Sequence, residues 1–343
     1  MRGIYTPVTD IRRKVFTEVA RMAYEVNELS DYEKLMRELP FKIIPGEEKS
    51  LRSSIFLERA IISERVRLAM GMSLRPLDES VPASEGLEHS VIADKYYEPP
   101  LINVIKFACN ACPEKIIKVT AMCQGCLAHP CQEVCPKHAI SFRNGKSHID
   151  QSLCVKCGRC VNSCPYSAIV KTQRPCEKGC PAGAISMGPD RKASIDVSQC
   201  IACGNCVYQC PFGAIQDKSF ITDAIHMIMG AEHWGYKTYA VLAPSIVGQF
   251  APASYGQVVA GLKKLGFNGV AEVALGADMV ADRESEELVE KGMLCSSCCP
   301  GFVGYIKKKH PEMENLISRT PSPMVMIGLH IKEKDPDAKV IFI

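Results

Sequence analysis

The chain has 343 residues and a formal net charge of +3, and 47% of its residues are hydrophobic. This length predicts two or three domains with substantial cores, and the near-balanced charge gives no indication of a nucleic-acid partner. No stretch approaches the roughly eighteen apolar residues of a membrane helix. The nineteen cysteines fall below the density of secreted disulfide scaffolds, and no export signal precedes them. We therefore expect a soluble, cytoplasmic protein from a cell that keeps oxygen low.

Residues 1–95 contain no cysteine and are predicted to be helical. Apolar residues three and four positions apart predict a first amphipathic helix. They are Ile11, Val15, Val19, Met22 and Val26. A second helix is predicted over 55–70, and Pro40, Pro45 and Gly46 predict a turn between the two. Residues 73–100 are rich in proline and acidic residues, which predicts an irregular arm, and we expect the whole region to cover the next domain as a scaffold.

Sixteen cysteines lie between residues 109 and 210 in runs typical of iron–sulfur proteins. Two runs have the spacing Cys-x2-Cys-x2-Cys-x3-Cys-Pro: Cys154, Cys157, Cys160, Cys164, and Cys200, Cys203, Cys206, Cys210. A third has two extra residues in its middle gap: Cys123, Cys126, Cys131, Cys135. A fragment, Cys176 and Cys180 followed by Pro181, has only the last two positions of such a run, and Cys109 and Cys112 form a separate Cys-x-x-Cys.

This spacing predicts how the cysteines divide among [4Fe–4S] clusters. Three thiolates of one run hold three corners of a cubane, whereas the fourth points to the cluster of a second run. The short connection between Cys135 and Cys154 pairs those two runs, and the fragment then pairs with the last run. Four ligand sets follow: Cys123, Cys126, Cys131, Cys164; Cys154, Cys157, Cys160, Cys135; Cys200, Cys203, Cys206, Cys180; and Cys109, Cys112, Cys176, Cys210. The outer two-cluster unit would therefore be split, with the inner one inserted into it.

Two other interpretations of these cysteines are weaker. Zinc also binds Cys-x-x-Cys pairs, but repeated runs of this spacing are not a zinc pattern. Cys109 and Cys112, taken alone, could be a buried or free thiol pair. Each oxidised cubane with four thiolates adds about −2 to the net charge, so four clusters would make the loaded protein mildly acidic.

Residues after Lys218 alternate between predicted helices and strands. Helices are predicted over 222–231, 255–265 and 277–290, and from Ser322-Pro323 to about 334. Strands are predicted over 238–242, 269–275 and 338–343. This alternation favours a parallel, helix-covered sheet. The chain ends on the apolar strand Val340, Ile341, Phe342, Ile343, from which we expect it to be a fragment of a longer protein.

A second cysteine group lies at residues 295–302, in the order Cys295-Ser296-Ser297-Cys298-Cys299-Pro300-Gly301-Phe302. Adjacent cysteines are often buried and inert. Here, however, residues 109–343 resemble the FeFe hydrogenases, specifically monomeric forms with an N-terminal multi-cluster domain. Residues 297–301 are similar to the first of that family's three signature loops, with Phe302 where many members have Trp and Ser296 where Thr is usual. The resemblance also covers Ala243-Pro244-Ser245, Gly276-Ala277-Asp278, Pro311-Glu312 and Ser322-Pro323.

The resemblance implies roles for individual residues. Cys299 would be a thiolate ligand of the active-site cubane, beside a di-iron cluster that the turn Ala243-Pro244-Ser245 would flank. Cys298 would carry protons between the di-iron site and a relay of Glu284, Ser318 and Glu287, which suits groups that can both accept and donate a proton. A solvated helix face is an equally simple interpretation of the carboxylates. Partners implied are a ferredoxin or similar electron carrier, H2 and protons, and maturation proteins for the active-site cluster.

The sequence departs from the family at its end. The second and third signature loops, which supply the other active-site cysteines, have no counterpart before Ile343, so the chain by itself is expected not to turn over hydrogen. Two alternatives remain open: a non-catalytic [4Fe–4S] electron-transfer subunit and a hydrogen-sensing relative.

The expected fold class combines three regions. Residues 1–95 form a helical region, and residues 96–218 form an α+β ferredoxin-like domain of two nested two-cluster units. Residues 219–343 form an incomplete α/β hydrogenase catalytic domain.

Overall fold

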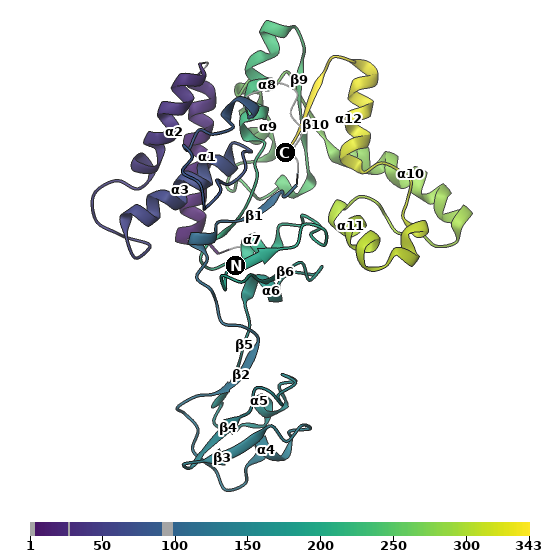
Figure 1. Cartoon of the computed structure of the whole chain (residues 1–343). Helices are drawn as coiled ribbons and strands as arrows, with labels where there is room; N and C mark the ends of the chain where they lie inside the picture. The colour runs from purple at the N-terminus through teal and green to yellow at the C-terminus, as the bar shows by residue number, and fades with distance from the viewer. Residues whose placement is uncertain (1–3, 27, 91–98) are drawn as a thin grey trace.

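The computed structural model describes residues 4–26, 28–90 and 99–343 (Figure 1). Its N-terminal region contains α1 (Pro7–Glu25), α2 (Leu29–Ile43) and α3 (Ile55–Ala69). The two helices expected from the sequence are α1 and α3. Thr6 begins α1 because its hydroxyl accepts the Thr9 amide at 3.3 Å and Pro7 occupies the first turn. The expected irregular arm has only the short 3-10 helix η1 (Leu87–His89) among its described residues, and its residues 91–98 lie outside them.

The predicted turn begins later than expected, because Pro40 lies inside α2, whereas Pro45 and Gly46 lie in the connection between α2 and α3. Helix α2 buries an apolar stripe, which consists of Tyr32, Met36, Leu39 and Ile43. Burial of one large apolar side chain contributes about 1.5–3 kcal/mol, whereas proline in a helix costs about 3 kcal/mol. Four such side chains therefore outweigh the proline, and the sequence prediction gave the proline too much weight.

The ferredoxin-like region consists of two units with the same order of elements. The inner unit contains β2 (Ile116–Val119), α4 (Pro130–Glu133), β3 (Ile140–Arg143), β4 (Lys146–Ile149), α5 (Arg159–Ser163) and β5 (Ile169–Thr172). The outer unit contains β1 (Ile102–Val104), η2 (Lys106–Ala108), α6 (Pro175–Lys178), β6 (Ile185–Met187), β7 (Ala193–Ile195), α7 (Asn205–Gln209) and β8 (Ile215–Asp217). The sequence of the inner unit lies between η2 and α6, and thus interrupts the outer one.

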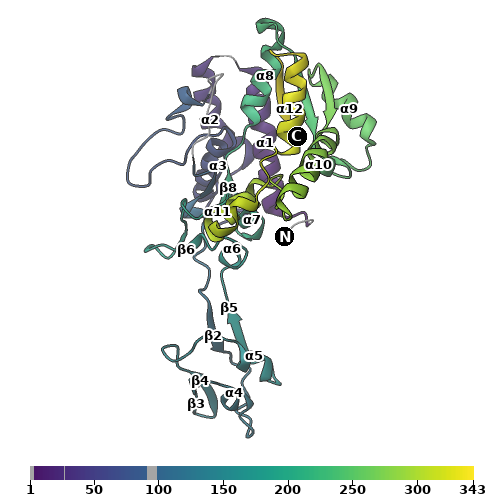
Figure 2. The ribbon, with the colours of Figure 1, turned by 90° about the vertical axis from the view of Figure 1, so that its right-hand side faces the viewer.

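The strand pairing of the two units is nested. Strands β2 and β5 pair antiparallel within the inner unit, and β1 and β8 pair antiparallel around it in sequence. Each unit also has its own hairpin, β3–β4 or β6–β7. Figures 1 and 2 show the inner unit standing away from the rest of the molecule at the end of the β2–β5 pair. We call residues 113–173 the distal lobe; it has a separate core around Ile117, Ile140 and Ile169.

The C-terminal region is a three-layer α/β/α structure, as the alternation of elements predicted. Its elements are α8 (Ile221–Trp234), β9 (Thr238–Leu242), η3 (Pro244–Ile246), α9 (Tyr255–Lys264), β10 (Gly269–Glu272), α10 (Val273–Lys291), α11 (Pro300–Lys309), η4 (Pro311–Leu316), α12 (Pro323–Lys334) and β11 (Lys339–Phe342). The sheet has the order β10-β9-β11 and is parallel. Successive residues of β9 face opposite layers: Ala240 and Leu242 pack with α8 and α9, and Val241 packs with α12.

The three regions share cores. Ile61 and Leu68 of α3 pack with Ile102, Ile105 and Ile215 of the outer unit. Arg12 of α1 forms an ion pair with Asp217 of β8 at 2.6 Å. The N-terminal helices therefore cover the outer unit, where the scaffold was expected. None of the helices within residues 4–26, 28–90 and 99–343 has the length and apolar character needed to cross a membrane.

Candidate iron–sulfur centres and the cysteine-pair loop

Four groups of cysteines come together in the two units. Three of them line separate cavities of about 20 Å³ each. These cavities are lined by Cys109, Cys112, Cys176 and Cys210; by Cys135, Cys154, Cys157 and Cys160; and by Cys123, Cys126, Cys131 and Cys164. In the fourth group, Cys206 is close enough to Cys180, Cys200 and Cys203 for their thiolates to raise its pKa. The structure thus brings together the cysteines that the spacing argument assigned to each set.

The first Cys-x-x-Cys of each of the four ligand sets has the same backbone conformation. In each, the residue just before the second cysteine has a positive φ between 47° and 61°. These residues are Ala111, Gly125, Lys156 and Ala202. A non-glycine residue rarely adopts this conformation, and it persists where the surrounding structure enforces it. The loop of Cys109 and Cys112 is therefore built like the other three, which argues against an incidental thiol pair.

The four Cys-Pro steps that end the cysteine runs and the fragment also repeat a hydrogen bond. In each, the backbone N–H of the alanine four residues later donates to the cysteine Sγ. The donor and acceptor pairs are Ala139 and Cys135 at 3.4 Å, Ala168 and Cys164 at 3.4 Å, Ala184 and Cys180 at 3.2 Å, and Ala214 and Cys210 at 3.3 Å. The first cysteines of two sets accept further amides from the hairpins: Ser147 donates to Cys123 and Ala193 donates to Cys109, both at 3.5 Å. Such donors stabilise thiolates and raise the reduction potential of a cluster.

The pKa values of the cysteine thiols in these sets fit a positively charged occupant. Burial, followed by repulsion from neighbouring thiolates, raises the pKa of Cys176 to about 11 and that of Cys206 to about 12. Four thiolates crowded together need a positive core to neutralise them, and an iron–sulfur core supplies it. The residues present therefore fit [4Fe–4S] clusters. Among the described residues, no three His, Cys, Asp or Glu side chains converge closely enough to hold a single metal ion.

One buried cation was not anticipated from the sequence. Arg174 is 3% exposed and lines the cavity of Cys109, Cys112, Cys176 and Cys210. Its Nε donates to the carbonyl of Cys112 and its Nη2 to that of Arg191, both at 3.0 Å. Its Nη1 is buried and has no hydrogen-bond partner. Its position directly before Pro175-Cys176 is the only signal in the sequence that could have suggested this role.

The cysteine-pair loop, residues 295–302, lies directly against the outer unit. A Cβ atom placed on Gly301 would lie 3.5 Å from the Cβ of Cys203 and 3.8 Å from the Sγ of Cys299. Three residues later, a Cβ on Gly304 would lie 3.5 Å from Ile201. Glycines one helical turn apart thus let α11 approach the 201–203 loop closely, and Cys203 and Cys299 flank the same glycine.

Two lysines at the end of α11 form hydrogen bonds to residues 199 and 200, just before the 201–203 loop. Lys308 donates to the carbonyl of Cys200 at 2.7 Å, and Lys309 donates to Oε1 of Gln199 at 2.7 Å. Cys298 and Cys299 are both exposed, and Cys299 is the N-cap of α11.

Glu284 and Glu287 lie three residues apart on α10, and Glu284 contacts the segment that carries the cysteine pair. The Ser296 hydroxyl donates to Glu284, at 3.1 Å from Oε1 and 3.2 Å from Oε2. Ser296 was noted only as a departure from the family, so sequence reasoning missed this contact. Glu284 is half-buried and Ser296 is exposed, which leaves the pair open to solvent.

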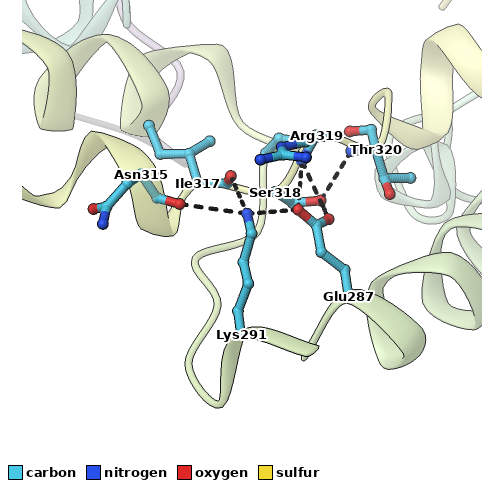
Figure 3. A network of polar contacts seen from close by, with 8 residues as sticks. Glu287, Lys291, Asn315, Ile317, Ser318, Arg319 and Thr320 are labelled. Atoms are coloured by element: carbon cyan, nitrogen blue, oxygen red, sulfur yellow. Dashed lines mark hydrogen bonds and ion pairs between the residues drawn. The ribbon is translucent and has the colours of Figure 1, made fainter. Parts of the chain in front are cut away.

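Glu287 is held by a denser network (Figure 3). Ser318 donates to its Oε2 at 2.8 Å, Lys291 donates to its Oε1 at 2.7 Å, and the Arg319 amide lies at 3.1 Å. These donors, Lys291 first, lower the pKa of Glu287 to about 2. Lys291 also donates to the carbonyls of Asn315 and Ile317 at 3.3 Å. The structure therefore brings Glu287 and Ser318 together, as the relay required, but also holds Glu287 in an ion pair with Lys291.

The turn Ala243-Pro244-Ser245 follows the carboxyl end of β9, as expected for a ligand-binding loop of a parallel sheet. The Ala243 amide donates to the carbonyl of Ile343 at 2.9 Å. Within the part of the chain that the structure describes, no hydrogen bond links this turn to the cysteine-pair loop. No three metal-binding side chains converge around Cys299 there either.

Comparison with known proteins identifies both cysteine regions. The family model "Iron only hydrogenase large subunit, C-terminal domain" matches residues 236–343, and "LdpA Fe-S cluster-binding domain" matches residues 123–173 and 170–221. Iron hydrogenase 1 of Clostridium pasteurianum is 27% identical over 254 residues, which cover 69% of this chain and 43% of that protein. The chain is an FeFe hydrogenase-like protein.

Other relatives match shorter stretches of this hydrogenase-like chain. Electron transport protein HydN of Escherichia coli (strain K12) is 39% identical over 67 residues, 20% of this chain and 38% of that protein. Uncharacterized ferredoxin MJ0265 of Methanocaldococcus jannaschii is 38% identical over 52 residues, 15% of this chain and 31% of that protein. The chain spans less than half the length of each of these relatives. Together with the cysteine sets, these matches make it an iron–sulfur protein.

Proposed function

We propose that the chain conducts electrons through four [4Fe–4S] clusters to or from a hydrogen-converting centre at Cys298 and Cys299, in the reaction H2 ⇌ 2H⁺ + 2e⁻. The observation that carries this proposal is the contact at Gly301. It joins Cys203, from a predicted cluster set, to Cys299, the predicted active-site ligand. A cluster loop seated on this cysteine would give electrons a short path between the two regions.

The four clusters take the ligand sets that the spacing argument assigned. They are Cys109, Cys112, Cys176, Cys210; Cys123, Cys126, Cys131, Cys164; Cys135, Cys154, Cys157, Cys160; and Cys180, Cys200, Cys203, Cys206. The three lined cavities and the repeated amide donors to sulfur support these sets. Two clusters then lie in the distal lobe and two in the outer unit. The lobe's two-cluster unit is thus inserted into the outer one, in the same way as its strand pair.

Electrons exchange with the partner at the distal lobe. Residues 113–173 hold eight of the chain's 41 Lys and Arg but only three of its 38 Asp and Glu. Two oxidised clusters, each adding about −2, would leave the lobe slightly positive and the rest of the molecule acidic. Leu127, beside Cys126, is 95% exposed, and Met122 and Leu153 are also exposed next to cluster cysteines. Exposed apolar side chains on a lobe with an excess of basic residues suit an acidic, ferredoxin-like electron carrier.

Protons move on the other side of the cysteine-pair loop. Cys298, with its exposed thiol, hands a proton toward the Ser296 and Glu284 pair, which opens to solvent. Glu287 and Ser318 belong to the proposed relay by resemblance. Glu287 also forms an ion pair with Lys291, which gives it a structural role as well. The di-iron group would supply the cleavage and formation of the H–H bond. We route no step through it, because the described residues offer only part of its ligand set.

Iron content tests the cluster proposal. Replacing both Cys109 and Cys112 with alanine removes two ligands of one set, so we expect iron per chain to fall by about four atoms, one cubane. Cys295 belongs to none of the sets, and Cys295→Ala is the matched control that keeps all its iron. The measurement is total iron and acid-labile sulfide on anaerobically purified protein. Unchanged iron in the double variant contradicts the split outer unit.

A second function, electron carriage without hydrogen conversion, is favoured by the match to HydN. Hydrogen evolution by the native polypeptide from its source cells, driven by a low-potential chemical reductant, separates the two. Clusters that are reduced and reoxidised without any hydrogen production support the electron-carrier function.

A further inference from the structure

The unpartnered Nη1 of Arg174 marks one cluster site as different from the others. Arg174 is held by two hydrogen bonds, to the carbonyls of Cys112 and Arg191, so its guanidinium cannot turn away freely. The remaining nitrogen is buried, and Arg174 lines the cavity of Cys109, Cys112, Cys176 and Cys210, which we call the outer cavity. A buried N–H without an acceptor is costly, and more so when the group is charged. The sulfur atoms of a cluster in this cavity would be the missing acceptors.

Other cations converge on the backbone of the same ligand loops. Arg65 is 4% exposed and donates to the carbonyl of Gly213, three residues after Cys210. Arg52 donates to the carbonyl of Phe212. Lys192 donates to the carbonyl of Cys109 at 2.7 Å. With Arg174, four positive side chains from different parts of the chain thus surround one ligand set.

The other two lined cavities lack a buried cation. The cavity of Cys123, Cys126, Cys131 and Cys164 is lined by no charged residue apart from its thiols. That of Cys135, Cys154, Cys157 and Cys160 is lined by Lys137 and Arg159, and both of these are exposed. Water screens an exposed charge, whereas a buried charge acts through a medium of lower dielectric constant. Arg174 therefore acts on its cavity much more strongly than Arg159 acts on its own.

We propose that Arg174 donates its Nη1–H to a sulfur of the cluster in the outer cavity and makes this cluster the first of the four to be reduced. The inference rests on the four-cluster assignment of the proposed function. Reduction adds one electron and changes the cluster with its four thiolates from about −2 to about −3, and no covalent bond forms or breaks. A donor and positive charges at this site favour the more negative form, which raises the reduction potential.

The position of the outer cavity suggests a role for the higher reduction potential of its cluster. Arg174 lies where the distal lobe rejoins the outer unit, two residues after β5 ends at Thr172. Cys112 and Cys176, two ligands of this cluster, flank the lobe in sequence, one on each side, so the cluster would lie where the lobe joins the outer unit, whose other ligand set contains Cys203 beside Cys299. An electron that enters through the lobe would rest at this point until a second one arrives, and hydrogen conversion requires two.

Potentiometric titration of the loaded full-length protein, followed by electron paramagnetic resonance, tests the proposal. The wave of the outer cluster is identified as the one that disappears when Cys109 and Cys112 are both replaced with alanine. We expect it to be the wave of highest potential. In Arg174→Gln it should fall by at least about 59 mV, which is a tenfold change in the ratio of reduced to oxidised cluster for one electron. Arg174→Lys, which keeps the charge, should restore part of the shift.

Arg159→Gln is the matched control, because it removes an exposed arginine from another cluster cavity, and it should move no wave by a comparable amount. An outer wave that does not shift in Arg174→Gln, with iron content unchanged, overturns the proposal, and so does an outer wave that is not the highest. Should both Arg174 variants lose the cluster, Arg65→Gln provides the second test: it lowers the same wave if the proposal holds, and an unmoved wave overturns it. Fewer than four clusters in the unmodified protein would instead refute the four-cluster assignment.

Discussion

Two carboxylates on the same helix face have different chemical surroundings. Glu284 receives one serine hydroxyl and opens to solvent, whereas Glu287 receives Ser318, a backbone amide and the ammonium of Lys291. The side chain of Glu287 is only 12% exposed, and its pKa of about 2 keeps it ionised throughout the neutral range. A carboxylate that rarely accepts a proton is a poor relay, so Glu284 is the better candidate of the two.

We predict that Glu287→Gln loosens the segment after α10 by a similar amount at pH 5 and pH 8. The folded pKa of about 2 lies below the ordinary value of 4.5, so the stabilising effect of the ionised form is fully present above about 4.5 and is lost only as the pH falls toward 2. Hydrogen exchange of the peptide containing Arg319, corrected for intrinsic rates, should be severalfold faster in the variant. Glu284→Gln, which leaves this network intact, is the control. A difference that appears only above pH 6 or 7 would indicate a titrating relay group instead.

Cysteines could be assigned from the sequence because a cubane requires fixed spacings, whereas their polar neighbours could not. Arg174, Arg65 and Lys192 reach one ligand set from residues far apart in sequence, and nothing in their local pattern distinguishes them from surface cations. Ser296 was visible as a neighbour of the cysteine pair. Its contact with Glu284 depends on how α10 crosses the loop, which only tertiary structure determines.

At the scale of elements, α10 and α12 cross so closely that one residue must lack a side chain. A Cβ on Gly276 would overlap the carbonyl oxygen of Pro323 and lie 3.1 Å from the backbone nitrogen of Ile327. Both are backbone positions at the start of α12, which Ser322 caps through the Val325 amide. Gly276 therefore sets the distance between the helix that carries Glu284 and Glu287 and the helix that packs on the sheet.

We predict that Gly276→Ala destabilises the C-terminal region although alanine favours helices. Replacing glycine with alanine in a helix contributes about 0.5–1 kcal/mol, but overpacking against backbone costs about 1–3 kcal/mol, so the net effect is a loss. Gly261→Ala in α9, where an added Cβ meets nothing within 4 Å, should instead stabilise by about 0.5–1 kcal/mol. Limited proteolysis under native conditions compares the two variants with the parent. Equal protection of both variants would contradict the close crossing.

Elements were predicted well where their periodicity was simple. The strand 238–242 and the Ser322-capped helix ending at Lys334 agree with β9 and α12. The prediction extended the strand at 269–275 too far, because β10 ends at Glu272 and α10 begins at Val273. An apolar run cannot by itself separate a strand end from a helix start. Helix α2 was missed because Pro40 was taken to mark a turn, although the apolar residues around it are spaced as in a helix.

At the scale of the whole molecule, the distal lobe places the proposed entry point for electrons at one extremity (Figure 2). Its core is separate from those of the N-terminal helices and the sheet. The sequence predicted that one two-cluster unit is inserted into another, because the cysteine sets require it. How far the lobe projects depends on the length of the β2–β5 pair, and no cysteine spacing encodes that length.

We predict that reversing charge on the lobe slows its reduction by an acidic electron carrier. Lys137→Glu combined with Arg143→Glu should lower the association rate about tenfold at low salt, since steering by complementary charge raises such rates by about 10–10³. The effect should fade at high ionic strength. Lys263→Glu combined with Lys264→Glu, on α9, makes the same change in net charge outside the lobe and should have little effect. Stopped-flow absorbance of cluster reduction measures the rates, and equal slowing by both pairs would place docking elsewhere.

The antiparallel pairing of β2 with β5 brings the two backbone ends of the lobe side by side, next to Cys112 and Arg174. A segment joined in this way behaves like a cassette. It can be removed, exchanged or duplicated at one splice point, while the outer unit and the sheet behind it keep their register. The choice of redox partner could therefore be changed, in evolution or by design, without altering the residues that would handle hydrogen.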